Sequence, residues 1–113
     1  MRWIAALLLL AVPVEAQSVA DRLNDYPTAA RADYVFACMQ TNGQSREVLI
    51  QCACSIDVVA SILPYEKYVE AETVLSMRQV GGERMAIFRS AASAEAQVAE
   101  LRRAQAEAEI LCF

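Results

Sequence analysis

The chain has 113 residues, 57% of which are hydrophobic, and acidic side chains outnumber basic ones by 14 to 10. The basic residues form no long block, so a nucleic-acid partner, which calls for a basic stripe, is not expected. The chain has no histidine, which removes histidine-based general-base chemistry and the usual nucleophile triads. We therefore do not expect an enzyme.

The amino-terminal residues have the order of a secretory signal peptide. Arg2 is followed by an apolar run over residues 3–12, the helix-breaking Pro13 and the small Ala16, and cleavage is expected after Ala16. An apolar run of about ten residues is too short to cross a hydrocarbon core of about 30 Å as a helix. We expect a signal peptide over residues 1–16 and no stable membrane insertion after its cleavage. An uncleaved anchor is the alternative.

Residues 17–113 are expected to form a single helical domain in which glycine and proline mark the ends of segments. Residues 17–26 are predicted to be a short helical arm or a flexible lead. A first helix is predicted over residues 28–41, with Gly43 in its carboxyl-terminal cap. A second helix is predicted over residues 45–63, with Ser45 as its amino cap.

The rest of the chain also has helical character. Pro64 suits the first turn of a third helix, because its missing N–H would be unpaired there, and this helix should end near Val80. A fourth helix is predicted over residues 83–113, with a bend where Ser93 could cap a new segment. Sustained alternation of apolar and polar residues is lacking throughout. The predicted fold class is all-α, a compact bundle of about four helices stapled by two disulfides.

Apolar residues are spaced by three or four along the two longest predicted helices. The second helix has two such faces and is therefore expected to be central and buried, whereas the last helix has one. The two faces of the second helix are Leu49, Cys52, Ile56, Val59 and Leu63, and Ile50, Cys54, Val58 and Ile62. The single face of the last helix is Val98, Leu101, Ala104, Ala108 and Leu111.

The four cysteines are predicted to form two structural disulfides, since an even set of thiols in a small exported domain is normally oxidised. Residues two apart on a helix point about 200° away from each other, so Cys52 and Cys54 cannot pair while the helix is intact. Each must then bond either Cys38 or Cys112. In a hairpin that turns near Gly43, Cys38 lies closer in register to Cys52. We therefore favour Cys38–Cys52 and Cys54–Cys112 over the crossed alternative.

Chemical roles for these thiols are less well supported. A reactive thiolate needs exposure and a positive neighbour or a helix amino terminus, whereas Cys52 and Cys54 are predicted in mid-helix on apolar faces. A zinc or haem site is disfavoured because the chain lacks histidine and any Cys-x-x-Cys spacing. We expect no metal and no cofactor.

Two groups of acids are candidate sites. Asp57 falls between the apolar faces of the second helix, where it is either a buried acid with a shifted pKa or a residue at a solvent edge, and the edge is favoured. Glu66, Glu70 and Glu72 could make a weak calcium-type site. Hard cations prefer a looped cage of six to eight oxygens, so a solvated face is favoured there.

Two tyrosines are the candidates for a partner surface. Tyr65 and Tyr68 follow Pro64 on adjacent turns, and tyrosine is enriched at interface hot spots. Half-buried core edges use tyrosine as often, so the core interpretation stays open beside the interface interpretation.

Several segments carry a resemblance to a known family. They are "DYVFACMQTNGQ", "CACSID" with "ILPYEKYVEAETV", "RQVGGER" and "AQAEAEILCF". Together they resemble a family of small exported four-cysteine helical proteins of Gram-negative bacteria. The resemblance implies a periplasmic setting and no particular activity. In size and format the chain is also similar to the periplasmic acid-stress chaperones of the HdeA and HdeB type, although the number of cysteines and the local sequence differ.

The sequence thus predicts a small, disulfide-stapled helical protein of the periplasm, or a secreted one. Its expected role is binding, as an accessory to another exported protein. The alternative is a chaperone-like holdase that exposes apolar surface under acid stress. A thiol-redox enzyme and a small-molecule carrier are further alternatives.

Overall fold

The computed structural model describes residues 24–113, and the signal peptide predicted for residues 1–16 lies outside them. The described elements are α2 (Thr28–Asn42), α3 (Arg46–Ile62), α4 (Tyr65–Gln79), a 3-10 turn (Glu83–Met85), α5 (Ala86–Ser90) and α6 (Ala92–Cys112). There is no strand among these residues. The prediction of an all-α fold with four long helices and two disulfides is confirmed.

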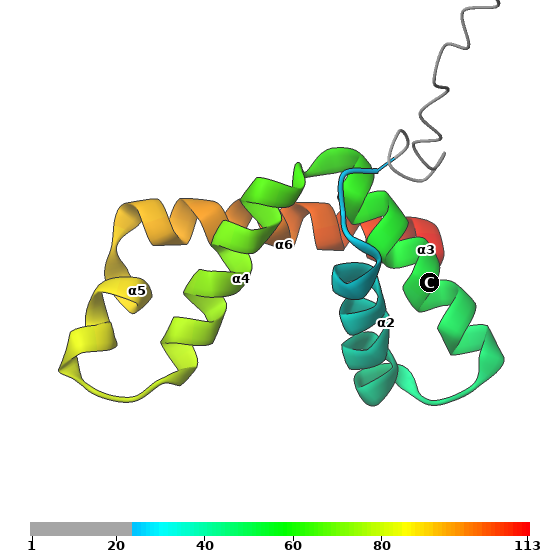
Figure 1. Ribbon diagram of the computed structural model, residues 1–113, viewed down its shortest axis with the longest axis horizontal. Helices are drawn as coiled ribbons and strands as arrows, with labels where there is room; N and C mark the ends of the chain where they lie inside the picture. The colour runs from blue at the N-terminus through cyan, green and yellow to red at the C-terminus, as the bar shows by residue number, and fades with distance from the viewer. Residues whose placement is uncertain (1–23) are drawn as a thin grey trace, which may run out of the picture.

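Helix α6 spans the molecule, and the other long helices extend from it as two arms (Figure 1). One arm is the α2–α3 hairpin, whose α3 helix is tied by a disulfide to the end of α6. The other arm is α4, which packs against the amino-terminal half of α6 through Val74, Ala94 and Val98. The chain bends by 113° between α3 and α4. This bend separates the free ends of the two arms.

The carboxyl end of α2 and the amino end of α3 carry the local signals expected from the sequence. Gly43 has a φ of 118° and donates its N–H to the Met39 carbonyl, a backbone conformation that favours glycine. The Ser45 hydroxyl accepts a hydrogen bond from the Val48 N–H at 3.2 Å, which satisfies one of the unpaired amides at the start of α3. Pro64 differs from the prediction, because it lies just before the first turn of α4 and not within it.

The predicted fourth helix is in fact three pieces. After the 3-10 turn and α5, the chain is extended at Ala91, with φ −65° and ψ 133°, and α6 begins at the next residue. Ser93 was the expected cap, but it lies inside α6, and the cap residue Ala91 has no side chain that could accept a hydrogen bond. The interruption allows α5 to contact both α4 and α6.

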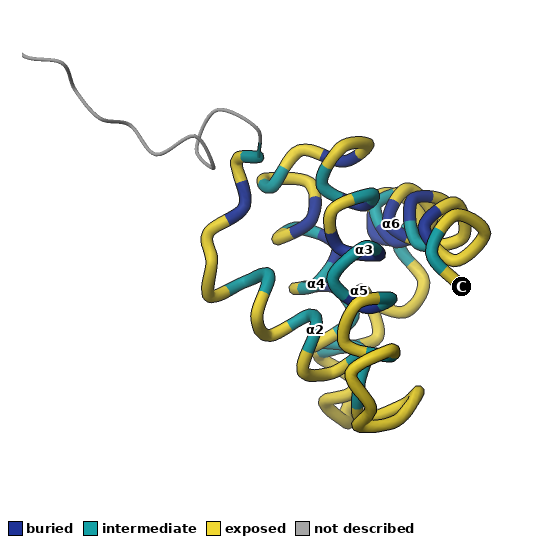
Figure 2. The backbone as a smooth tube through the Cα atoms, turned by 90° about the vertical axis from the view of Figure 1, so that its right-hand side faces the viewer, coloured by how far each residue is buried: buried dark blue, intermediate teal, exposed yellow. Residues whose placement is uncertain are grey.

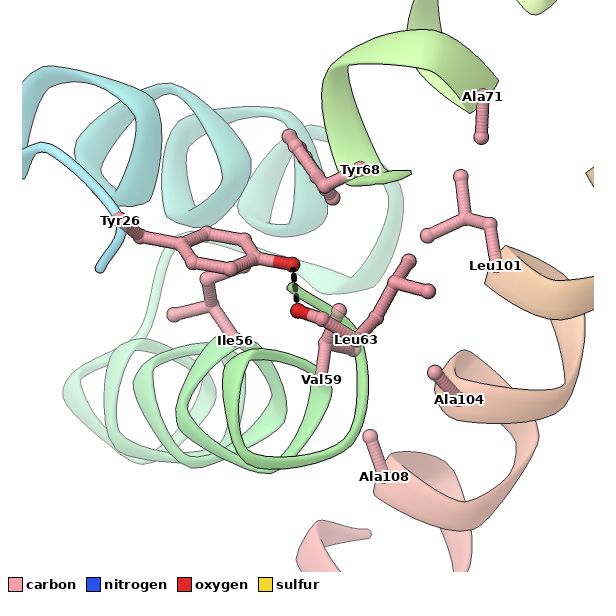
Figure 3. Packing of buried hydrophobic residues seen from close by; sticks show 9 residues of the cluster. All are labelled: Tyr26, Ile56, Val59, Leu63, Tyr68, Ala71, Leu101, Ala104 and Ala108. Carbon is pink, nitrogen blue, oxygen red and sulfur yellow. Dashed lines mark hydrogen bonds between the residues drawn. The ribbon is translucent and has the colours of Figure 1, made fainter. Parts of the chain in front are cut away.

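The main core lies where α3, α4 and α6 meet, and Figure 2 shows buried residues along α3 and α6. One face of α3 packs against small residues of α6, whose lack of bulk lets the two backbones come close. The cluster consists of Tyr26, Ile56, Val59, Leu63, Tyr68, Ala71, Leu101, Ala104 and Ala108 (Figure 3).

The predicted apolar faces are only partly buried. The first face of α3 is buried from Cys52 onward, and Leu49 is exposed. The second face was expected to be buried as well, but Ile50 and Ile62 at its two ends are exposed, and only Cys54 and Val58 between them are partly buried. On α6 the predicted face is buried as far as Ala108, whereas Leu111 is exposed.

The segment before α2 is neither a helical arm nor a flexible lead in its described part. Tyr26 is only 3% exposed, and its hydroxyl donates a hydrogen bond to the Leu63 carbonyl at 2.7 Å (Figure 3). Its ring lies 5.1 Å, centroid to centroid, from the rings of Tyr65 and Tyr68. The Asp25 carboxylate accepts a hydrogen bond from the Tyr65 N–H at 2.9 Å. An acid at this position accepts a hydrogen bond from an otherwise unpaired amide at the start of α4. Its negative charge also interacts favourably with the positive end of the α4 dipole.

Candidate functional site

The cysteines form the favoured pairs. Cys38 bonds Cys52 and Cys54 bonds Cys112, with Cα separations of 5.9 Å and 5.7 Å, and no cysteine is free. Their opposite directions on α3 attach it to α2 on one side and to α6 on the other. Two disulfides in so small a domain indicate an oxidising, exported compartment.

The two tyrosines proposed as partner anchors belong to the aromatic cluster around Tyr26. Tyr68 is buried, at 9% exposure, and Tyr65 is half-buried. Their rings stack on each other with centroids 6.2 Å apart. The core interpretation therefore describes Tyr68, and neither residue stands on an exposed turn.

The candidate acids do not gather into a metal site. Asp57 is exposed, as favoured. Glu70 accepts from Lys67 at 3.4 Å and from Gln97 at 3.3 Å, whereas Glu72 is half-buried. Across the described part of the chain, no group of three or more histidine, cysteine, aspartate or glutamate residues could hold a metal ion.

A cluster of exposed apolar side chains surrounds the end of α6. We call it the apolar cap, and its members are Ile50, Ile110, Leu111 and Phe113, which are 58%, 82%, 64% and 51% exposed. Leu111 and Phe113 flank Cys112 in sequence, and Cys112 is bonded to Cys54. Ile50 precedes Cys54 by one helical turn and so lies on the same face of α3. The disulfide therefore fixes the end of α6, with its exposed apolar side chains, beside the turn of α3 that carries Ile50.

A second candidate lies between the arms. We call it the inter-arm groove, a hollow of about 750 Å³ lined by side chains from α2, α4 and α6. Asp33 and Tyr34 come from α2, Tyr68 and Glu72 from α4, and Arg102 from α6. On α6, Arg102 Nη1 donates a hydrogen bond of 3.0 Å to the side-chain oxygen of Gln105, which also lines the groove.

Partial burial and neighbouring acidic groups raise the pKa of two side chains that line this groove, Glu72 and Tyr68. Desolvation raises the pKa of the Glu72 carboxyl above its ordinary value, and the nearby Arg102 opposes this rise only in part. Desolvation, followed by the negative charge of Glu72, raises the pKa of the Tyr68 hydroxyl. Asp33 and Tyr34 act on Tyr68 in the same direction. The side chains of α2 and α4 thus face one another closely enough to interact.

Neither surface was predicted from the sequence. The sequence did contain one signal for the apolar cap. Three of the last four residues, Ile110, Leu111 and Phe113, are large and apolar, and they lie on different sides of the helix turn. The inter-arm groove had no local signal, because its lining comes from three helices whose mutual arrangement depends on the bend after Leu63.

Comparison with protein-family models, with curated proteins and with solved structures found no match to this chain. Within residues 24–113, no single helix has both the length and the apolar character needed to cross a membrane. Helices α3 and α4 meet those criteria only as a pair, bent by 113°.

Proposed function

We propose that this protein acts by binding another exported protein through the apolar cap, as an accessory in the periplasm or outside the cell. The observation that supports this proposal is the exposure of four large apolar side chains on a surface that the Cys54–Cys112 disulfide holds in place. Several large apolar side chains left exposed near one end of a small exported protein are candidates for an interaction site.

The disulfide makes this surface well suited to binding. Beyond Ala108 the last turn of α6 buries no large side chain, so packing alone would hold it weakly. A crosslink to α3 restricts that turn before a partner arrives, which lowers the entropy lost on association. Glu107 and Glu109 lie on the same turns and are exposed. The matching partner surface is an apolar pocket with basic groups at its edge.

Glu72 favours this proposal over an acid-triggered chaperone. Desolvation raises the pKa of its carboxyl above the ordinary value. Acid therefore relieves the cost of burying this group and does not open the fold there. The apolar cap is also exposed without any trigger.

Photo-crosslinking in the exported protein tests the proposal. A photoreactive residue at Ile110 should give one discrete adduct, and the same residue at Ala99, exposed on the middle of α6, should give none. With the crosslinked partner purified, the double variant Ile110→Ser, Leu111→Ser should weaken binding at least about tenfold. The matched control Val69→Ser, Val80→Ser removes exposed apolar side chains of α4 and its flank and should leave affinity unchanged.

Other results would contradict the proposal. Equal losses in the two double variants would show that general surface hydrophobicity is responsible. An adduct formed only with a second copy of this chain would indicate self-association. A broad set of adducts, together with protection of an aggregating client at about pH 2–3, would instead support the chaperone function.

A further inference from the structure

We propose that the inter-arm groove is a binding site for a small cationic zwitterion, namely a basic amino acid or a short basic peptide. This inference does not depend on the apolar cap, which lies at the end of α6. The groove volume of about 750 Å³ falls within the range of small-molecule sites, about 300–1,000 Å³.

The charges of the groove are complementary to such a ligand. Asp33 and Glu72 supply two negative charges on opposite arms, and Arg102 supplies one positive charge on α6. A basic amino acid carries one carboxylate and two cationic groups. Its carboxylate can pair with the Arg102 guanidinium, and its cationic groups can pair with the two carboxylates. Each charge of the ligand is then paired with an opposite charge of the groove lining.

Glu72 supplies the main reason to expect a ligand. Its side chain is half-buried, yet it makes no hydrogen bond and no ion pair within the described residues, and Arg102 lies beyond ion-pair distance of it. A partly desolvated carboxylate without a partner is unfavourable. An ammonium group bound in the groove would pair with these carboxylates in place of water, and charge-assisted bonds of this kind are the stronger ones.

Two tyrosines complete the site. Tyr34 and Tyr68 line the groove beside the carboxylates, and the Tyr34 hydroxyl is fixed by a 2.8 Å hydrogen bond with Ser55. Tyr68 is held by the core through its contacts with Tyr26 and Tyr65, so one wall of the groove is formed before any ligand arrives.

The first experiment titrates the oxidised protein with L-arginine and follows backbone amide signals by NMR. Saturable shifts are expected in α2, α4 and α6 around the groove. Agmatine, which lacks the carboxylate, should bind at least about tenfold more weakly, because the bond to Arg102 is lost. L-Glutamate, with the opposite net charge, should not bind. Shifts that do not saturate, or equal affinities for L-arginine and agmatine, would overturn the proposal.

Variants then assign the residues. Glu72→Gln and Arg102→Gln should each weaken L-arginine binding at least about tenfold. Their matched controls, Glu66→Gln and Arg103→Gln, change exposed residues of α4 and α6 outside the groove lining and should retain full affinity. Asp33→Asn alters an exposed side chain, so it should keep the fold and still weaken binding. Equal behaviour of groove and control variants would refute the assignment, provided that thermal unfolding shows all of them folded.

Discussion

Replacing Tyr26 with phenylalanine removes a single oxygen from the core. That hydroxyl donates to the Leu63 carbonyl at 2.7 Å, and the same carbonyl accepts no other hydrogen bond among the described residues. Leaving a buried acceptor without its donor costs about 1–3 kcal/mol. For a domain of this size, each kcal/mol lowers the melting temperature by about 4–8 °C. We therefore expect the Tyr26→Phe variant to melt at least about 4 °C below the parent protein.

The measurement is thermal unfolding of the oxidised protein, followed by circular dichroism. Tyr65→Phe is the matched control, because the Tyr65 hydroxyl has no hydrogen-bond partner in residues 24–113 while its ring belongs to the same cluster. This control should change the free energy of unfolding by no more than about 0.5 kcal/mol. If the two variants melt together, Tyr26 is not docked at the end of α3, and the account of the lead segment is wrong.

Two further predictions concern the disulfides and the buried acid. Replacing both Cys54 and Cys112 with serine should lower the free energy of unfolding in urea by about 4 kcal/mol, and replacing Cys38 and Cys52 by about 3 kcal/mol, since the chain-entropy cost grows with the 58 and 14 residues that separate the bonded pairs. The reverse order would contradict this account. Because the folded pKa of Glu72 is raised above its ordinary 4.5, the stability associated with this group is complete at low pH and falls as pH rises through that folded pKa. Glu72→Gln should therefore raise the melting temperature at about pH 7 and leave it unchanged at about pH 3. A gain of the same size at both pH values would show that charge burial is not the cause.

Local chemistry in the sequence determined where α2 ends and where α3 begins. Gly43 permits the positive φ that follows α2, and Ser45 supplies an acceptor to the first amides of α3. These interactions involve residues within a few positions of each other, so they can be recognised without knowledge of the rest of the fold. The 100° step of a helix likewise excluded a Cys52–Cys54 bond, and the register of the α2–α3 hairpin favoured the pairing that is found over the crossed one.

The tertiary structure decided which apolar residues are buried. Ile50 and Leu111 lie at the ends of predicted apolar faces, and both side chains are exposed because no other described part of the chain covers them. Tyr26 shows the opposite case, since it lies outside any helix and is buried by residues 37 to 42 positions later in the chain. Helical periodicity specifies a direction around the helix axis, whereas burial also requires another element at that position along the axis. The inter-arm groove likewise depends on how α2, α4 and α6 are placed in space. Its side chains can be read from the sequence, but their proximity to one another cannot.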